Sequence, residues 1–125
     1  MTDDAEIIGI APQFVVKDVI KTAEYYRDVF GFSIISYFLD PPVYAMVERN
    51  GFQIHFGKAD SDRIHTNAEI RKISMDCILW VPEIEKFFEE VKSRNADIVE
   101  EIVNRGYGRE FILRDCDGHT ISVVD

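Results

Sequence analysis

The sequence of 125 residues is poor in cysteine and tryptophan and has no long hydrophobic run. Its two cysteines, Cys77 and Cys116, are too few for a disulfide framework and form no Cys-x-x-Cys pair, so we expect free thiols. A membrane-spanning helix needs about 20 consecutive apolar residues, and the sequence contains no such segment. The first four residues include two aspartates where a secretory signal would be basic. We therefore expect a cytoplasmic protein.

Positive charge is also scarce, because 14 Lys and Arg residues stand against 23 Asp and Glu residues. The resulting net charge of −9 would repel the phosphates of nucleic acids and of anionic membranes, so neither is an expected partner. The same charge is compatible with a cationic small molecule. With 46% apolar and 30% charged residues, the chain has the composition of a water-soluble globular protein of one domain.

The main organisational feature is an internal repeat. A β-type run over residues 10–18 precedes one helical pattern, and a second run over residues 73–81 precedes another. The apolar positions of these two helical patterns are Val19, Ala23, Tyr26 and Phe30, and Ile84, Phe87, Phe88 and Val91. Val16 aligns with Val81 at an offset of 65 residues, and Ala23 with Phe88 and Tyr26 with Val91 keep the same offset.

Local signals predict where both helices begin and end. The Asp18 carboxylate is suited to cap the first helix, and Gly31 to follow its last turn. Pro82 and Glu83 would open the second helix, since proline suits a first turn. Asn95 would end it, because asparagine tolerates the left-handed conformation.

Each helical pattern is followed by three short β-type segments, at about 32–39, 43–48 and 52–56 and again at about 97–102, 109–114 and 119–124. Asn50-Gly51 and Asp117-Gly118 are typical of hairpin turns between the last two segments of each set. Both halves therefore read βαβββ. This order predicts an α+β fold of two tandem modules, at about residues 7–57 and 72–125, joined by the polar segment 58–71 in a single domain.

Several motifs in this frame point to a known family. They are Val16-Lys17-Asp18-Val19, the run from Tyr25 to Phe32, the hairpin from Arg49 to Phe56, Gly106-Tyr107-Gly108-Arg109-Glu110-Phe111, and the run from Arg114 to His119. With them the chain resembles the vicinal oxygen chelate superfamily of glyoxalases, extradiol dioxygenases and bleomycin resistance proteins, and the bleomycin resistance branch most. The resemblance implies curved mixed sheets that form a cup, with modules paired across a homodimer.

The resemblance also raises the question of a metal. In catalytic branches a divalent ion sits in the cup, held by the first and last strands of the modules. These positions fall on Ala11, Asp76, Ser122 and either Gln53 or His55. Ala11 has no donor atom and Ser122 is a poor ligand, so at most two usable ligands remain. We therefore expect no catalytic residue, no metal and no other cofactor.

Alternation along the strands predicts which side chains line the cup. Helix-facing strand residues should be Phe14, Val16, Cys77, Leu79 and Val81. The opposite face should carry the predicted ligand-binding residues Trp80, Asp76, Gln53, His55, Phe38, Tyr44, Tyr107 and Phe111. Aromatic rings stack on planar ligands and attract cations, and Asp76 would neutralise a cationic group.

The remaining polar signals are weaker. His65 lies in the connecting segment and should be solvated, and His119 should be a turn residue. The cluster Asp115-Cys116-Asp117 is better explained as a tight turn than as a reactive thiol site.

The function implied by the resemblance is non-enzymatic sequestration of a cationic, aromatic antibiotic of the bleomycin type, which confers resistance. Two alternatives stay open. One is a metal-dependent, glyoxalase-like lyase, isomerase or transferase, and the other is a binding module for an unrelated metabolite.

Overall fold

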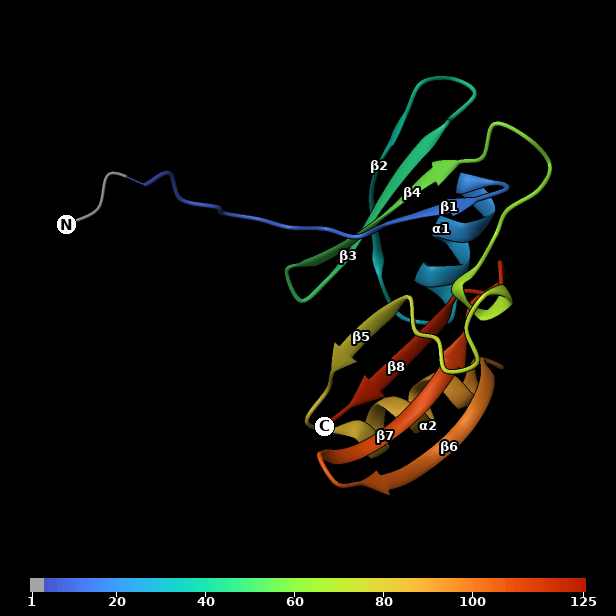
Figure 1. Cartoon of the computed structure of the whole chain (residues 1–125). Helices are drawn as coiled ribbons and strands as arrows, with labels where there is room; N and C mark the ends of the chain where they lie inside the picture. Colours follow the sequence, from blue (N-terminus) through green and yellow to red (C-terminus); the bar gives the residue numbers. More distant parts are fainter. Residues whose placement is uncertain (1–3) are drawn as a thin grey trace.

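The computed structural model describes residues 4–125 and divides them into two halves of the same design (Figure 1). The first half contains β1 (Gln13–Val16), α1 (Val19–Asp28), β2 (Ser33–Phe38), β3 (Tyr44–Arg49) and β4 (Phe52–Lys58). The second contains β5 (Cys77–Trp80), α2 (Ile84–Ser93), β6 (Asp97–Arg105), β7 (Gly108–Arg114) and β8 (Thr120–Val124). The predicted α+β fold of two βαβββ modules is confirmed. Residues 1–3, part of the acidic start, lie outside the described residues.

Each module forms a mixed four-stranded sheet in which the first strand lies beside the last. The strand orders are β1-β4-β3-β2 and β5-β8-β7-β6. β1 runs parallel to β4 and β5 parallel to β8, whereas the other neighbours are antiparallel. α1 packs on β2, β3 and β4, and α2 packs on β6 and β7, so each sheet carries its helix on one face. Figure 1 shows the two modules one above the other.

The boundaries of α1 follow the local signals. The Asp18 carboxylate accepts hydrogen bonds from the backbone N–H groups of Ile20 and Lys21, at 3.0 and 3.1 Å, and so caps the helix as predicted. Gly31 follows with a φ of 76°, in the left-handed region where glycine has no steric cost.

The second helix begins later than predicted, because Pro82 precedes the N-cap instead of standing in the first turn. Glu83 is the N-cap of α2, which begins at Ile84, and it makes no side-chain cap hydrogen bond. Asn95 follows the last turn with a φ of 63°, as predicted. Asn50 and Gly51, with φ values of 55° and 87°, form the turn between β3 and β4. The connection between the modules contains the 3-10 helix η1 (Asn67–Glu69).

One hydrophobic core spans both modules. Of the strand residues predicted to face the helices, Phe14 and Val16 belong to this core, and Cys77, Leu79 and Val81 pack against it. Their helix partners Tyr26, Phe30, Phe87 and Val91 are at most 5% exposed. Burial of these large side chains is the main favourable contribution to folding.

The turn between β7 and β8 joins the two modules through one carboxylate. Asp115 accepts hydrogen bonds from Tyr26 Oη of α1 at 2.7 Å and from His119 Nδ1 at 3.1 Å. It also accepts the backbone N–H groups of Asp117 and His119, each at 2.9 Å. The His119 ring stacks on Phe14 of β1, with ring centroids 4.8 Å apart. His119 is therefore the predicted turn residue, and its side chain is in addition a buried contact between the modules.

A second contact joins the modules through the guanidinium of Arg49 at the end of β3. Arg49 Nη1 donates to the Phe30 carbonyl oxygen and to the Glu90 carboxylate of α2, both at 2.7 Å. The same guanidinium lies 5.1 Å from the ring centroid of Phe87. Both junctions therefore involve the helix side of the sheets.

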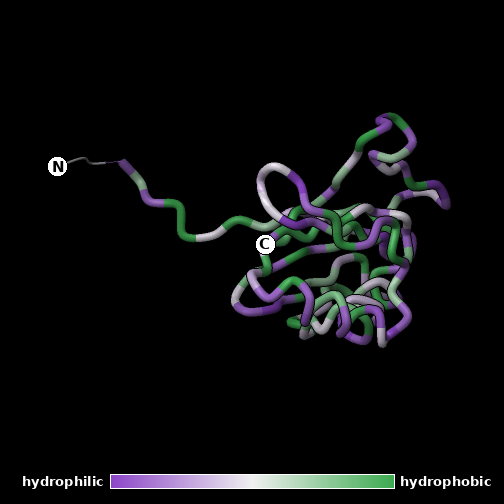
Figure 2. The backbone as a smooth tube through the Cα atoms, turned by 90° about the horizontal axis from the view of Figure 1, so that it is seen from below, coloured by the Kyte–Doolittle hydropathy of each residue, from purple (hydrophilic) through white to green (hydrophobic). Residues whose placement is uncertain are grey.

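Nine residues precede β1 in the described chain. Residues 5–11 make no hydrogen bond, and Ile7, Ile8 and Ile10 are 87%, 93% and 96% exposed. Figures 1 and 2 show this segment extended away from the two modules, with hydrophobic residues along it. In residues 4–125 no helix is long and apolar enough to cross a membrane.

The buried pair at the first junction titrates as an ion pair. Burial opposes the charged form of His119, but its hydrogen bond to Asp115 and the charge of that carboxylate outweigh burial and raise the pKa of His119. Burial likewise opposes ionised Asp115, but hydrogen bonds from His119 and Tyr26, together with the imidazolium charge, lower its pKa.

We predict a matching dependence of stability on pH. The raised pKa of His119 gives a contribution that is complete below its ordinary value of 6.5 and is lost as pH rises through the raised value. The lowered pKa of Asp115 gives a contribution that is present above 3.8 and lost as pH falls through the lowered value. Urea unfolding should therefore show a free energy of unfolding that falls as pH rises above 6.5 through the raised pKa of His119.

The variant Asp115→Asn should lose about 1–3 kcal/mol near pH 6 and most of this slope, because the imidazolium loses its partner. His65→Gln is the matched control, since the His65 side chain is 72% exposed and pairs with Glu69 of η1 outside the junction. A slope that survives in Asp115→Asn would show that another group causes it.

Candidate functional site

Each sheet has one face that carries no helix. We call the face of the first sheet away from α1 the first open face, and the face of the second sheet away from α2 the second open face. Residues paired across neighbouring strands share a face, so the strand register identifies the side chains on each.

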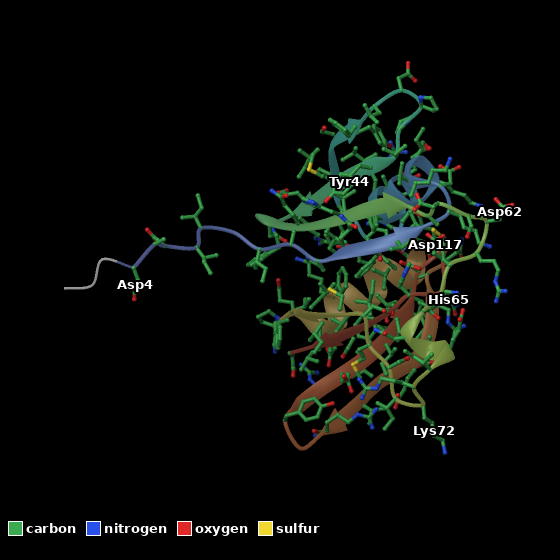
Figure 3. The ribbon with its side chains drawn as sticks, turned by 45° about the horizontal axis from the view of Figure 1, so that its top comes forward. Asp4, Tyr44, Asp62, His65, Lys72 and Asp117 are labelled. Atoms are coloured by element: carbon green, nitrogen blue, oxygen red, sulfur yellow. The ribbon has the colours of Figure 1, made fainter. Side chains whose placement is uncertain are left out.

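The first open face has two central rows. Each row runs across the sheet in the strand order β1, β4, β3 and β2. The first row contains Gln13, His55, Met46 and Ser36, and the second contains Val15, Gly57, Tyr44 and Phe38. The Phe38 side chain is 60% exposed. Figure 3 labels Tyr44 on the upper module, away from the junction marked by Asp117.

A chain of hydrogen bonds crosses the first open face. Tyr44 Oη lies 2.6 Å from His55 Nδ1, and His55 Nε2 lies 2.8 Å from Gln53 Oε1. Tyr44 and His55 meet edge to face, with ring centroids 5.4 Å apart. Four predicted ligand-binding residues, Phe38, Tyr44, Gln53 and His55, are thus together on one surface.

The second open face also has two central rows. Here the rows run in the strand order β5, β8, β7 and β6. The first row contains Trp80, Val124, Glu110 and Val103, and the second contains Ile78, Ser122, Ile112 and Glu100. Trp80 is 71% exposed and Ile78 is 44% exposed, so this face presents a large apolar surface to solvent.

The polar centre of the second open face is Glu110. Its Oε1 accepts hydrogen bonds from Arg105 Nε at 3.1 Å and from Tyr107 Oη at 2.8 Å, and its Oε2 accepts the Ser122 hydroxyl. Arg105 also donates to Glu100 at 2.6 Å. Burial raises the pKa of Glu110, but these hydrogen bonds and the Arg105 charge outweigh it and leave the pKa below its usual value. The carboxylate therefore stays ionised at neutral pH.

Phe111 is not on the open face, contrary to the prediction. Its side chain is fully buried and meets Phe88 of α2 edge to face, with ring centroids 5.1 Å apart. Because neighbours along a strand point to opposite faces, the residue before it, Glu110, takes the open face instead. The alternation of Phe111 and Leu113 as helix-facing residues was the signal that could have identified Glu110.

Asp76 is held at the edge of the second sheet. Its Oδ2 accepts the backbone N–H of Thr120 at 2.8 Å, and its Oδ1 accepts the side-chain amide of Asn67 in η1 at 2.7 Å. The carboxylate thus fixes η1 against β8. The predicted residue Tyr107 lies in the turn between β6 and β7, 67% exposed.

The predicted site residues form two groups rather than one. Within residues 4–125, no hydrogen bond or ion pair joins the first open face to the second. The junctions between the modules lie on the helix side, at Asp115 and Arg49.

The donor groups on the open faces do not fit a divalent metal. Both ring nitrogens of His55 have partners, and the Ser122 oxygen is bound to Glu110. Among the described residues, one cluster brings three potential metal-binding side chains within reach of a single ion, and it consists of Asp115, Asp117 and His119. This group lies at the module junction, and its Asp115 carboxylate already accepts four hydrogen bonds.

Cys116 lies in the same turn. Burial of its sulfur and the neighbouring charge of Asp117 raise the pKa of Cys116 to about 12. The thiol is therefore protonated at neutral pH and is a poor nucleophile, as the interpretation of this segment as a tight turn implies.

Comparison with known proteins agrees with this class of fold. The model of the Glyoxalase/Bleomycin resistance protein/Dioxygenase superfamily matches residues 10–123. The chain belongs to this superfamily. The comparison with curated proteins found no match.

Solved structures show the same architecture at low sequence identity. A bleomycin-binding protein from Streptomyces verticillus, complexed with copper(II)-bleomycin, is 16% identical with a TM-score of 0.70, covering 97% of this chain and 98% of its own. FosX from Listeria monocytogenes, a fosfomycin resistance protein, is 18% identical with a TM-score of 0.67, and the match covers 95% of this chain and 90% of that one. The FosX structure is of an E126Q mutant complexed with Mn(II) and dihydroxypropylphosphonic acid. A glyoxalase-related enzyme from Clostridium phytofermentans is 18% identical with a TM-score of 0.76, covering 98% and 97%. These similarities show the fold alone.

We predict that the two faces of the second sheet differ sharply in their tolerance of truncation. Phe111→Ala should lower the free energy of unfolding by about 3–5 kcal/mol, because it leaves a cavity in the core. Trp80→Ala should change it by only about 0.5 kcal/mol, because the side chain is exposed. Urea unfolding of both variants tests the assignment, and a large loss for Trp80→Ala would contradict it.

Proposed function

We propose that this protein is a non-enzymatic, cytoplasmic binding protein that sequesters a cationic, aromatic small molecule, such as an antibiotic of the bleomycin type. The observation that carries the proposal is the exposed aromatic surface of the open faces. Trp80 and Tyr107 on the second module and Phe38 on the first are each at least 60% exposed. Aromatic faces of this kind stack on planar ligands and attract cations.

The chemistry of the donor groups favours binding over catalysis. The polar groups of the open faces are hydrogen-bonded to one another, and no set of ligands for a divalent ion gathers there in residues 4–125. A metal-dependent reaction like that of the enzymes in this superfamily therefore has less support than sequestration. A binding module for an unrelated metabolite would use the same aromatic surface.

We also propose that the protein works as a homodimer. Both open faces expose large apolar side chains, and Ile7, Ile8 and Ile10 extend from the body of the chain with no cover. A second copy would bury these surfaces and convert two shallow faces into crevices.

Sequestration predicts that metal-free bleomycin quenches the fluorescence of the single tryptophan, Trp80, in a saturable manner at about micromolar concentration. Trp80→Ala should weaken binding at least about tenfold in calorimetry, because a stacked, desolvated ring is lost. Phe52→Ala is the matched control, since Phe52 is 77% exposed and begins β4 of the first sheet, whereas Trp80 ends β5 of the second.

Trp80 fluorescence that does not change with added bleomycin would contradict binding of bleomycin. It would favour the alternative in which the protein binds an unrelated metabolite. Equal affinity for the wild-type and Trp80→Ala proteins would remove Trp80 from the site.

The dimer is tested separately. Sedimentation equilibrium of the full chain should give twice the chain mass of 14.4 kDa. Replacement of Ile7, Ile8 and Ile10 by serine should weaken association at least about tenfold, because apolar area is no longer buried. A monomer at all concentrations would contradict the proposal.

A further inference from the structure

The hydrogen-bonded chain on the first open face fixes the positions of two protons. His55 Nε2 lies 2.8 Å from the side-chain amide oxygen Oε1 of Gln53, and an amide oxygen only accepts hydrogen bonds. Nε2 must therefore carry the proton. In the neutral ring, Nδ1 is then an acceptor.

The phenol completes the chain. His55 Nδ1 lies 2.6 Å from Tyr44 Oη, so the hydroxyl of Tyr44 donates its proton to the ring. Tyr44 Oη therefore presents only lone pairs to a ligand on the open face, because its proton points to the His55 ring. A ligand group that donates a hydrogen bond fits this oxygen, whereas a ligand carbonyl does not.

The surroundings of this oxygen suit a cation. Phe38 is the register partner of Tyr44 on the neighbouring strand β2, and its ring is exposed. Next to Tyr44 on β4 is Gly57, which has no side chain, and the Gln13 amide oxygen lies 3.1 Å from where a Cβ of Gly57 would stand. Tyr44 therefore stands between the Phe38 ring on β2 and the bare backbone of Gly57 on β4, beside which lies the Gln13 amide oxygen.

We propose that this surface recognises an organic ammonium group that carries at least one N–H, with Tyr44 Oη as the acceptor and the Phe38 ring as the cation–π face. His55 and Gln53 are positioning residues that hold the phenol proton away from the ligand. The inference rests on the proposed function and names the ligand group that this face accepts.

The test uses two cations of equal charge that differ in one N–H. N,N-dimethylbenzylammonium can donate to Tyr44 Oη, and benzyltrimethylammonium cannot. Titration of the full chain, followed by NMR signals of the His55 ring, should show about tenfold tighter binding of the first, because a hydrogen bond from a charged donor is gained. Tyr44→Phe should abolish this preference and keep the shared, weaker affinity from the aromatic rings.

Tyr37→Phe is the matched control, because Tyr37 of β2 packs against the core and not on the open face. It should keep the preference for the N–H-bearing cation. The same NMR experiment on the free protein should show a protonated Nε2 and an unprotonated Nδ1 for His55. The opposite tautomer, equal affinity for the two cations, or no binding of either would each overturn the inference.

The cation titrations and the bleomycin titration can fail independently, so they test the inference and the proposed function separately. Quenching of Trp80 by metal-free bleomycin without a preference between the two cations would overturn the inference and leave sequestration supported. A preference between the cations without bleomycin binding would support the inference and contradict the bleomycin-type ligand.

Discussion

A buried carboxylate in the turn between β7 and β8 joins the two modules. Asp115 accepts hydrogen bonds from a phenol of the first module, an imidazole of its own turn and two backbone amides. A buried carboxylate with fewer donors would be costly, because its charge would be poorly solvated. With four donors it is satisfied, and it fixes the β7–β8 turn against α1. Together with the Arg49–Glu90 contact and the shared core, it sets how the two open faces are placed.

Because the junctions use the helix side, the open faces remain available. Their side chains combine exposed aromatic rings with polar groups that are already hydrogen-bonded to one another. The proposed function uses these features, because ring faces and directed hydrogen bonds can select a ligand that lies on such a surface. The fold alone does not set this function, since the side chains on the open faces determine what the surface can bind.

Local signals in the sequence predicted most of the fold. The helix caps at Asp18 and Asn95, the Asn50-Gly51 turn and the helix-facing side of the first strand of each module all follow from short-range patterns. The position of Phe111 did not, since a one-residue uncertainty in the start of a strand exchanges its two faces. The hydrogen bond between Tyr26 and Asp115, separated by 89 residues, depends on packing that no local pattern encodes.

The segment before β1 has a consequence of its own. Its three isoleucines are almost fully exposed and residues 5–11 make no hydrogen bond, so a second chain that covers them would be favoured. In the proposed homodimer, folding and association would be linked by mass action, and the apparent stability of the protein would rise with its concentration. The fraction of chains whose open faces are completed by a partner would then depend on the amount of protein present.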